Sequence, residues 1–371
     1  MVVLQCFVYI LMTFAFLYAF SINNHVRKEL LCTIKNNVTF PRIEMLNRRD
    51  YVFLLCFFTA VVLFRLFIDP QSIPDTWYYA DNFKIVGNIP LHTLIIDGGA
   101  DYDIEDEKGF LILTKILYTL LPYQNLYIGI IGCIICCGYY YLIKGYSQIV
   151  WMSCILFLLG GFNQSLFVLR QYLAIAVIIF SFSFIIKREF LKYIVCIGIA
   201  FLFHRTAIVF LPVYFIYGIE NKKLFIIISM ASVVVGRIAI ITILGHVLTV
   251  YSDLAAYASD EEGANIKMAL YLSAILIVRL VLLRKCYWDK GVNRLFTIVL
   301  LFGTAFSILS YGFGFDRIVV IFSTFLCVII PQTIISIKKP IIKYGFAITF
   351  ITIQFYLWMG SLSHLSTMKF L

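Results

Sequence analysis

The sequence predicts an all-α fold, a polytopic bundle of transmembrane helices that forms one integral membrane domain over residues 1–371. The chain is 62% hydrophobic and only 13% charged, whereas about a quarter of the residues in soluble domains are charged. Apolar runs of bilayer-crossing length recur, and basic and acidic residues fall in alternate connections. We therefore expect about 12 membrane helices (roughly 10–12) and one acidic outer loop near 69–123.

Each expected span is a mostly apolar run that approaches the roughly 20 residues needed to cross the hydrocarbon core. The runs at 149–162 and 295–309 are short for a complete crossing. The spans are expected at 2–20, 51–68, 124–143, 149–162, 166–186, 224–245, 268–283, 295–309, 318–336 and 344–361.

The apolar stretch 190–218 is flanked on both sides by charged, mostly basic residues. Both flanks are therefore expected on the cytoplasmic side, with an even number of crossings between them. Two arms of about 14 residues would each be only about 21 Å long. The stretch is either a pair of short helices that turns near His204 and Arg205 without fully crossing, or two short tilted spans. The first alternative places His204 and Arg205 at a cavity, because a buried turn must be shielded or lined by water.

The distribution of charge predicts the orientation in the membrane. The net charge of +10 comes mainly from basic connections that share one side when the helices alternate, and the positive-inside rule makes that side cytoplasmic. The connections at 69–109 and 250–267 are acidic and should face the opposite side. Directly after the first of these, 110–121 is amphipathic enough to form an interfacial helix. Because membrane orientation accounts for the basic residues, no nucleic-acid partner is expected.

Several arginines depart from this orientation pattern, and all of them except Arg279 lie toward the outer half of the membrane or its core. Guanidinium groups bind phosphate in a bidentate manner and stay charged at any working pH. Arg170, Arg205 and Arg317 each stand at an outer helix end, and we interpret them as an anion site rather than as pairing residues. For the remaining three, pairing with buried acids or carbonyls, or snorkelling, is the favoured interpretation. These three are Arg65, Arg237 and Arg279.

His204 adjoins Arg205 in the stretch suspected of lining a cavity. A neutral imidazole there could act as a general base, although a lone histidine in an apolar stretch is often a packing residue. No nucleotide-binding loop, zinc-binding helix or nucleophile elbow is found. Asp101 and Asp103 have a metal-ligand spacing but lie inside a run of acids. We therefore expect no metal and no cofactor.

Short motifs in the same order resemble the O-antigen polymerase family of the Wzy and EpsG type. They are Leu169-Arg170-Gln171, Phe203-His204, an outer-loop Asp75 with Tyr79 and Phe83, Glu107-Lys108-Gly109-Phe110, and Arg317 after an aromatic-rich segment. The chain departs from the family pattern in one place, because Thr206-Ala207 follow His204 with Arg205 inserted between.

The resemblance implies a polymerase at the periplasmic face of the bacterial inner membrane. Such an enzyme transfers a growing glycan from undecaprenyl pyrophosphate to a single lipid-linked repeat unit, and makes O-antigen, capsule or exopolysaccharide without nucleotide sugars. Its partners are the lipid-linked donor and acceptor and the membrane lipid, and the sequence leaves open whether another protein regulates chain length.

The resemblance also assigns roles to individual residues. Arg170, Arg205 and Arg317 would bind the pyrophosphate, and Gln171 would assist substrate binding. His204 is the first candidate for the base and Glu107 the second. Asp75 and Tyr79 would contact the acceptor sugars.

Three other functions remain open from the sequence. A flippase for lipid-linked sugars would need access from both leaflets, whereas the unusual arginines lie mainly toward one face. An O-antigen ligase would use the same donor with a different acceptor. A non-catalytic scaffold would use the outer arginines for pairing only.

Overall fold

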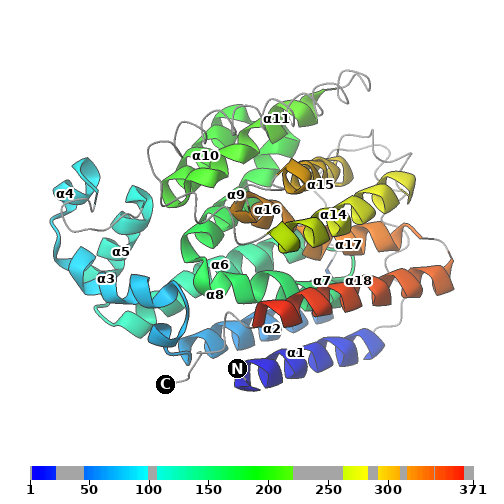
Figure 1. The fold of residues 1–371 in the computed structure, drawn as a ribbon, viewed down its shortest axis with the longest axis horizontal. Coiled ribbons are helices and arrows are strands. Elements are labelled where there is room, and N and C mark those ends of the chain that lie inside the picture. The colour runs from blue at the N-terminus through cyan, green and yellow to red at the C-terminus, as the bar shows by residue number, and fades with distance from the viewer. Residues whose placement is uncertain are drawn as a thin grey trace.

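A computed structural model of the chain describes residues 2–21, 46–98, 107–219, 262–282, 291–309, 316–337 and 339–362 (Figure 1). The predicted span at 224–245 and the acidic run 99–106 lie outside these residues. The regular elements in the described segments are helices, which confirms the all-α prediction.

Five of these helical segments are long and apolar enough to cross a membrane. They are α1 (Val2–Ser21), α6 (Gln124–Tyr146), the continuous run Val150–Phe167, α9 (Leu169–Lys187) and α18 (Pro340–Ser361). The run Val150–Phe167 joins α7 (Val150–Phe157) and α8 (Asn163–Phe167) through a π-helical turn.

A sixth span would be formed by α16 (Asp316–Ser323) and α17 (Leu326–Ile335), which meet at a bend of 41°. The other predicted spans in the described residues are α2 (Arg48–Leu66), α14 (Glu262–Leu282) and α15 (Val292–Leu309). Charged residues lie in the first and last turns of α2 and inside α14, and α15 is short. The total of about 12 membrane helices therefore stays a prediction.

The helix α9 lies in the middle of the molecule and organises the packing (Figure 1). It packs against α6 on one side and α10 (Phe190–Phe203) on another. Gly138 of α6 faces Ala176 of α9, and a Cβ on this glycine would lie only 2.8 Å from the alanine Cβ. Small residues of this kind let membrane helices approach closely. The packing fixes the first turn of α9, which begins with Leu169 and Arg170.

The stretch 190–218 forms α10, a 3₁₀ segment at Arg205–Phe210 and α11 (Leu211–Gly218). Helix α10 ends because His204 has an extended backbone, with φ −160° and ψ 122°. The 14 residues of α10 and 8 of α11 are each fewer than the roughly 20 needed for a crossing. The structure thus confirms short arms that turn at His204 and Arg205, and whether these arms cross the membrane stays a prediction.

The described part of the predicted outer loop is helical, and Figure 1 shows it grouped at one end of the molecule. It contains a 3₁₀ turn (Pro70–Ser72), α3 (Thr76–Asn88), α4 (Leu91–Ile96) and α5 (Lys108–Leu120). Helix α5 is the expected amphipathic helix, and its apolar face packs on α3 and α10. The stretch 69–109 is too short and too poor in apolar residues to fold on its own. Its described part is ordered because it shares the core of the helices beneath it.

Two arginines predicted to be structural are buried and donate hydrogen bonds to protein groups. Arg65 donates to the Ser165 hydroxyl and carbonyl, both at 2.7 Å. Arg279 is 0% exposed and donates to the hydroxyls of Thr297 and Thr333, the side chain of Gln332 and two carbonyls. The structural interpretation is confirmed for both, whereas Arg237 lies outside the described residues.

Replacing Arg279 with alanine should destabilise the protein strongly, because the buried hydroxyls and carbonyls would lose a charged donor. Hydrogen bonds to charged groups contribute about 1.5–3 kcal/mol each, so we expect a loss of at least about 3 kcal/mol. Thermal unfolding in detergent would measure this change. The matched control is Arg48→Ala, since Arg48 is exposed, and equal melting temperatures for the two variants would contradict the structural role of Arg279.

Candidate functional site

A pocket of about 240 Å³ forms where the start of α3, the start of α9, the His204 turn and the start of α16 meet. Six of the eight residues singled out from the sequence line it: Asp75, Tyr79, Arg170, Gln171, His204 and Arg317. The other lining residues are Trp77, Tyr78 and Val168. The expected convergence of residues from distant helix ends is therefore present in the fold.

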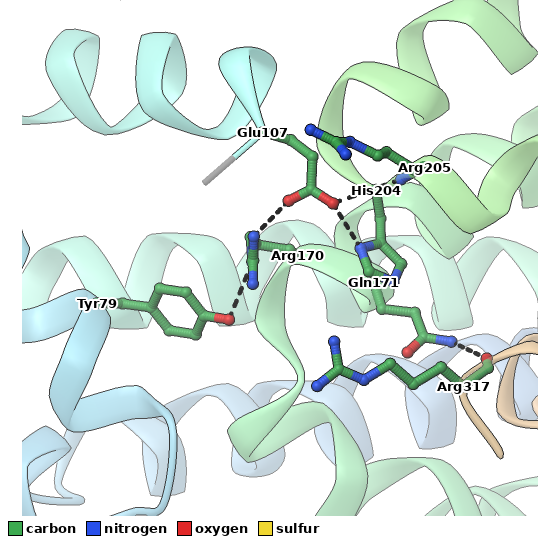
Figure 2. Close-up of polar contacts among 7 residues, drawn as sticks. All are labelled: Tyr79, Glu107, Arg170, Gln171, His204, Arg205 and Arg317. Atoms are coloured by element: carbon green, nitrogen blue, oxygen red, sulfur yellow. Dashed lines mark hydrogen bonds and ion pairs between the residues drawn. The ribbon is translucent and has the colours of Figure 1, made fainter. Parts of the chain in front are cut away.

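Glu107 does not line this pocket but contacts Arg170 and His204, which lie on two of its walls (Figure 2). Its Oε2 accepts from Arg170 Nη1 at 2.5 Å, and its Oε1 lies 2.9 Å from His204 Nδ1. The backbone N–H of Arg205 also points to Oε1, at 3.4 Å. One carboxylate thus fixes a cation on α9 and an imidazole at the end of α10.

Gly109 allows Glu107 to reach this position. Glu107 directly precedes α5, and α5 approaches the end of α10 so closely that a Cβ on Gly109 would lie 2.6 Å from the carbonyl oxygen of Leu202. No side chain fits in that space without moving backbone. The Glu-x-Gly spacing therefore has a physical reason, because the glycine brings the glutamate within reach of His204.

The electrostatic surroundings keep Glu107 ionised. Its side chain is 11% exposed, and burial of this kind tends to raise the pKa of a carboxyl group. The hydrogen bond with His204 and the positive charge of Arg170 outweigh the burial, and the pKa of Glu107 falls to about 2. A carboxylate with this pKa is a weak base near neutral pH.

His204 is held with one ring nitrogen against Glu107, and its other ring nitrogen is buried. An ionised carboxylate can only accept, so Nδ1 carries the proton in this contact. In the neutral ring, Nε2 then carries the lone pair. His204 is 7% exposed, and its Nε2 is buried with no hydrogen-bond partner in the described part of the chain. An unpaired basic nitrogen at a pocket wall can accept a proton from a bound hydroxyl.

Arg170 is positioned from two sides. Its Nε donates to the Tyr79 hydroxyl at 3.1 Å, and its guanidinium carbon lies 5.6 Å from the centre of the Tyr79 ring. Tyr79 in turn packs edge-on against Phe110 of α5, with ring centroids 5.1 Å apart. The orientation of this cation therefore depends on α3 and α5 as well as on α9.

Arg317 and Arg205 have different positions. The Gln171 side chain donates to the carbonyl oxygen of Arg317 and fixes the start of α16 against α9. The exposed Arg317 side chain lines the pocket, and Figure 2 shows it reaching across from α16. The side chain of Arg205 is also exposed, but it does not line the pocket, and only its backbone N–H contacts the site.

The sequence did not assign Trp77, Tyr78 and Gly109 to the site. Trp77 and Tyr78 stand in an acidic segment, and nothing in the local pattern distinguishes them from ordinary residues of a solvated loop. Gly109 was noted only as part of a motif, because a close approach between helices cannot be seen without their packing.

The fold and the pocket together define a helical membrane protein with an arginine-lined pocket beside a carboxylate–histidine pair. A protein-family model described as EpsG family matches residues 50–370. The chain therefore belongs to the EpsG family, and this membership is compatible with a glycosyltransferase-type polysaccharide polymerase. No curated protein and no solved structure matches the chain.

Gly109→Ala should destabilise the protein by about 1–3 kcal/mol, as overpacking against a fixed carbonyl does. Gly198→Ala on α10 is the matched control, because nothing lies within 4 Å of a Cβ there. Melting temperatures in detergent would separate the two variants. If Gly109→Ala has the same melting temperature as Gly198→Ala, the close contact between α5 and α10 does not exist as described.

The depressed pKa of Glu107 also predicts a dependence of stability on pH. The unfolded chain takes up a proton near the ordinary pKa of 4.5, whereas the folded state resists protonation down to about 2. Glu107 thus stabilises the fold fully above about pH 4.5, and this contribution is lost as the pH falls toward about 2. Between about pH 6 and about pH 3, the melting temperature should fall more steeply for the native protein than for Glu107→Gln. If the melting temperatures of the two proteins fall in parallel with pH, the Glu107 carboxylate is not held by Arg170 and His204.

Proposed function

We propose that this protein polymerises oligosaccharide repeat units that are linked to undecaprenyl pyrophosphate. The product would be an O-antigen, capsule or exopolysaccharide chain. The reaction would take place at the periplasmic face of the bacterial inner membrane, where the positive-inside rule puts the acidic connections. Membership of the EpsG family supports this class of reaction.

The observation that carries the proposal is the combination of groups around one pocket. Arg170 and Arg317 line it together with His204, whose Nδ1 is held by Glu107. A glycosyl pyrophosphate is an activated donor, so the reaction needs positive charge for the departing diphosphate and a base for the attacking hydroxyl. The pocket offers both.

In the proposed step, a hydroxyl at the non-reducing end of the acceptor attacks the anomeric carbon of the donor glycan. A new carbon–oxygen bond forms while the bond to the diphosphate oxygen breaks, and the diphosphate leaves with the bonding electrons. The hydroxyl proton passes to Nε2 of His204. Glu107 stabilises the resulting imidazolium without taking the proton itself, as the carboxylate does in related acid–base triads.

The contacts favour His204 over Glu107 as the base, because both oxygens of Glu107 are engaged and its pKa is about 2. We assign Glu107 to positioning Arg170 and His204. Arg170 and Arg317 form the clamp for the diphosphate, and two guanidinium groups allow the step to proceed without a metal ion. Arg205 contributes through its backbone, so its side chain is secondary in this scheme.

A deletion strain that carries variants of the gene would test this proposal, with a gel ladder of surface polysaccharide as the measurement. Without the gene, a single repeat unit should remain on the lipid. The native gene should restore the ladder, and Arg170→Ala should reduce polymer at least about 100-fold. Arg170→Lys should not restore it, since lysine lacks the fork that binds phosphate and carboxylate in two places.

Arg205→Ala is the matched control in the same strain. It removes an exposed guanidinium close to the site but keeps the backbone N–H that Glu107 accepts from. It should retain polymer within about tenfold of the native protein. Loss of even the single repeat unit on deletion would point to a flippase. A strain that lacks only a polymerase should still transfer single, unextended repeat units from the lipid carrier to the final acceptor. If the deletion stops this transfer, the result would point to a ligase.

A further inference from the structure

The wall of the pocket that comes from α3 differs chemically from the other walls. Asp75, Trp77 and Tyr78 lie on this wall, whereas the remaining walls provide Arg170, His204 and Arg317. Asp75 is the one carboxylic acid among the described lining residues. The pocket therefore has a cationic part and a part that combines a carboxylate with exposed aromatic rings.

Asp75 is held in an uncommon backbone conformation. Its φ is 60° and its ψ is −33°, and the N–H of Thr76 donates to the carbonyl of Pro74 at 2.7 Å. This is a γ-turn with a positive central φ, which is rare and strained for a residue other than glycine. Thr76 anchors the turn, because its buried hydroxyl donates to the Leu166 carbonyl at 2.6 Å.

The strained turn directs the Asp75 carboxylate to the pocket. An aspartate at a helix N-cap usually accepts hydrogen bonds from the first backbone N–H groups. Asp75 occupies this position of α3, but its side chain makes no such bond to the described first turn. Strain that persists at one residue is common where a side chain must face a ligand, and here the side chain lines a cavity.

The charge of Asp75 determines which part of a substrate this wall can take. A carboxylate repels a diphosphate, so the diphosphate belongs with Arg170 and Arg317 on the other side. A carboxylate can accept hydrogen bonds from two neighbouring hydroxyl groups. A neutral sugar ring therefore suits the α3 wall.

The aromatic residues complete such a surface. Trp77 is 49% exposed, and its ring stands at 90° to that of Tyr78, with centroids 6.2 Å apart. An exposed tryptophan in a membrane protein is often an interfacial anchor, but this one lines the pocket next to Asp75. An indole face is a large apolar surface with a fixed geometry, suited to the C–H face of a sugar.

We infer that residues 75–78 form the subsite for the neutral terminal sugar of the acceptor, with Trp77 stacking on the ring and Asp75 accepting from its hydroxyls. This assignment rests on the proposed polymerase function and makes these residues determinants of acceptor choice. Tyr79, in contrast, is committed to Arg170 through its hydroxyl and is a positioning residue.

Two binding probes test the inference with the full-length protein in detergent. The first is the repeat-unit oligosaccharide released from its lipid carrier by mild acid, and the second is inorganic pyrophosphate, both measured by calorimetric titration. Asp75→Asn keeps a side chain that tolerates positive φ, and it should weaken oligosaccharide binding about tenfold or more. Trp77→Ala should have a similar effect, and Trp77→Phe should recover most of the affinity.

The same variants should bind pyrophosphate within about twofold of the native protein, or more tightly for Asp75→Asn because a repelling charge is removed. Arg317→Ala should show the reverse pattern, with weakened pyrophosphate binding and unchanged oligosaccharide binding. Lys84→Ala, an exposed change on α3, is the control and should change neither. A merely structural role for Asp75 or Trp77 would affect both probes together.

The inference is overturned if Asp75→Asn and Trp77→Ala bind the oligosaccharide as tightly as the native protein does. It is also overturned if the native protein binds pyrophosphate but not the oligosaccharide, a result that leaves the proposed polymerase function standing. If the expected pattern of binding holds but the gene does not restore the polysaccharide ladder, the sugar subsite stands and the polymerase function fails.

Discussion

The contact of one carboxylate with two separate walls of the pocket is the interaction on which the site depends. Glu107 holds Arg170 through one oxygen and His204 through the other, across sequence separations of 63 and 97 residues. Because an ionised carboxylate accepts but does not donate, the contact sets the tautomer of the histidine as well as its position. Glu107 can do this only because Gly109 lets α5 press against the backbone of α10. A packing constraint between two helices thus determines the orientation of the groups that we assign to catalysis.

Burial separates the arginines of this chain into two classes with different roles. Arg65 and Arg279 are buried and give their hydrogen bonds to hydroxyls and carbonyls inside the bundle. A charged group inside a membrane is tolerated when protein groups surround it in this way. Arg317 instead stands at a helix end and lines a pocket. The same residue type therefore joins helices in the interior and, at the surface of the bundle, lines the pocket that we propose binds the diphosphate.

The sequence was sufficient to predict the helical class, the turn at His204, the two structural arginines and most of the pocket. These features follow from local patterns, because apolar runs define helices and a polar residue at a helix end tends to face a cavity. The role of Glu107 and the place of Arg205 could not be predicted in the same way. A 3₁₀ turn begins at Arg205, directly after the extended backbone of His204. The His204 side chain therefore lines the pocket, whereas the Arg205 side chain does not. The helix α3 could not be predicted either, because its apolar face is covered by α5 and α6, which lie outside its own stretch of sequence.

The most direct test of the account is polymer formation by the purified protein in lipid vesicles, with the lipid-linked repeat unit as the only substrate. Our account predicts that chains longer than one repeat appear without any nucleotide sugar. It also predicts that His204→Gln abolishes them, while the folded protein and its binding of pyrophosphate are retained. If the native protein leaves the repeat unit unextended, or if His204→Gln extends it at the native rate, the proposed roles of the pocket and of its histidine are wrong.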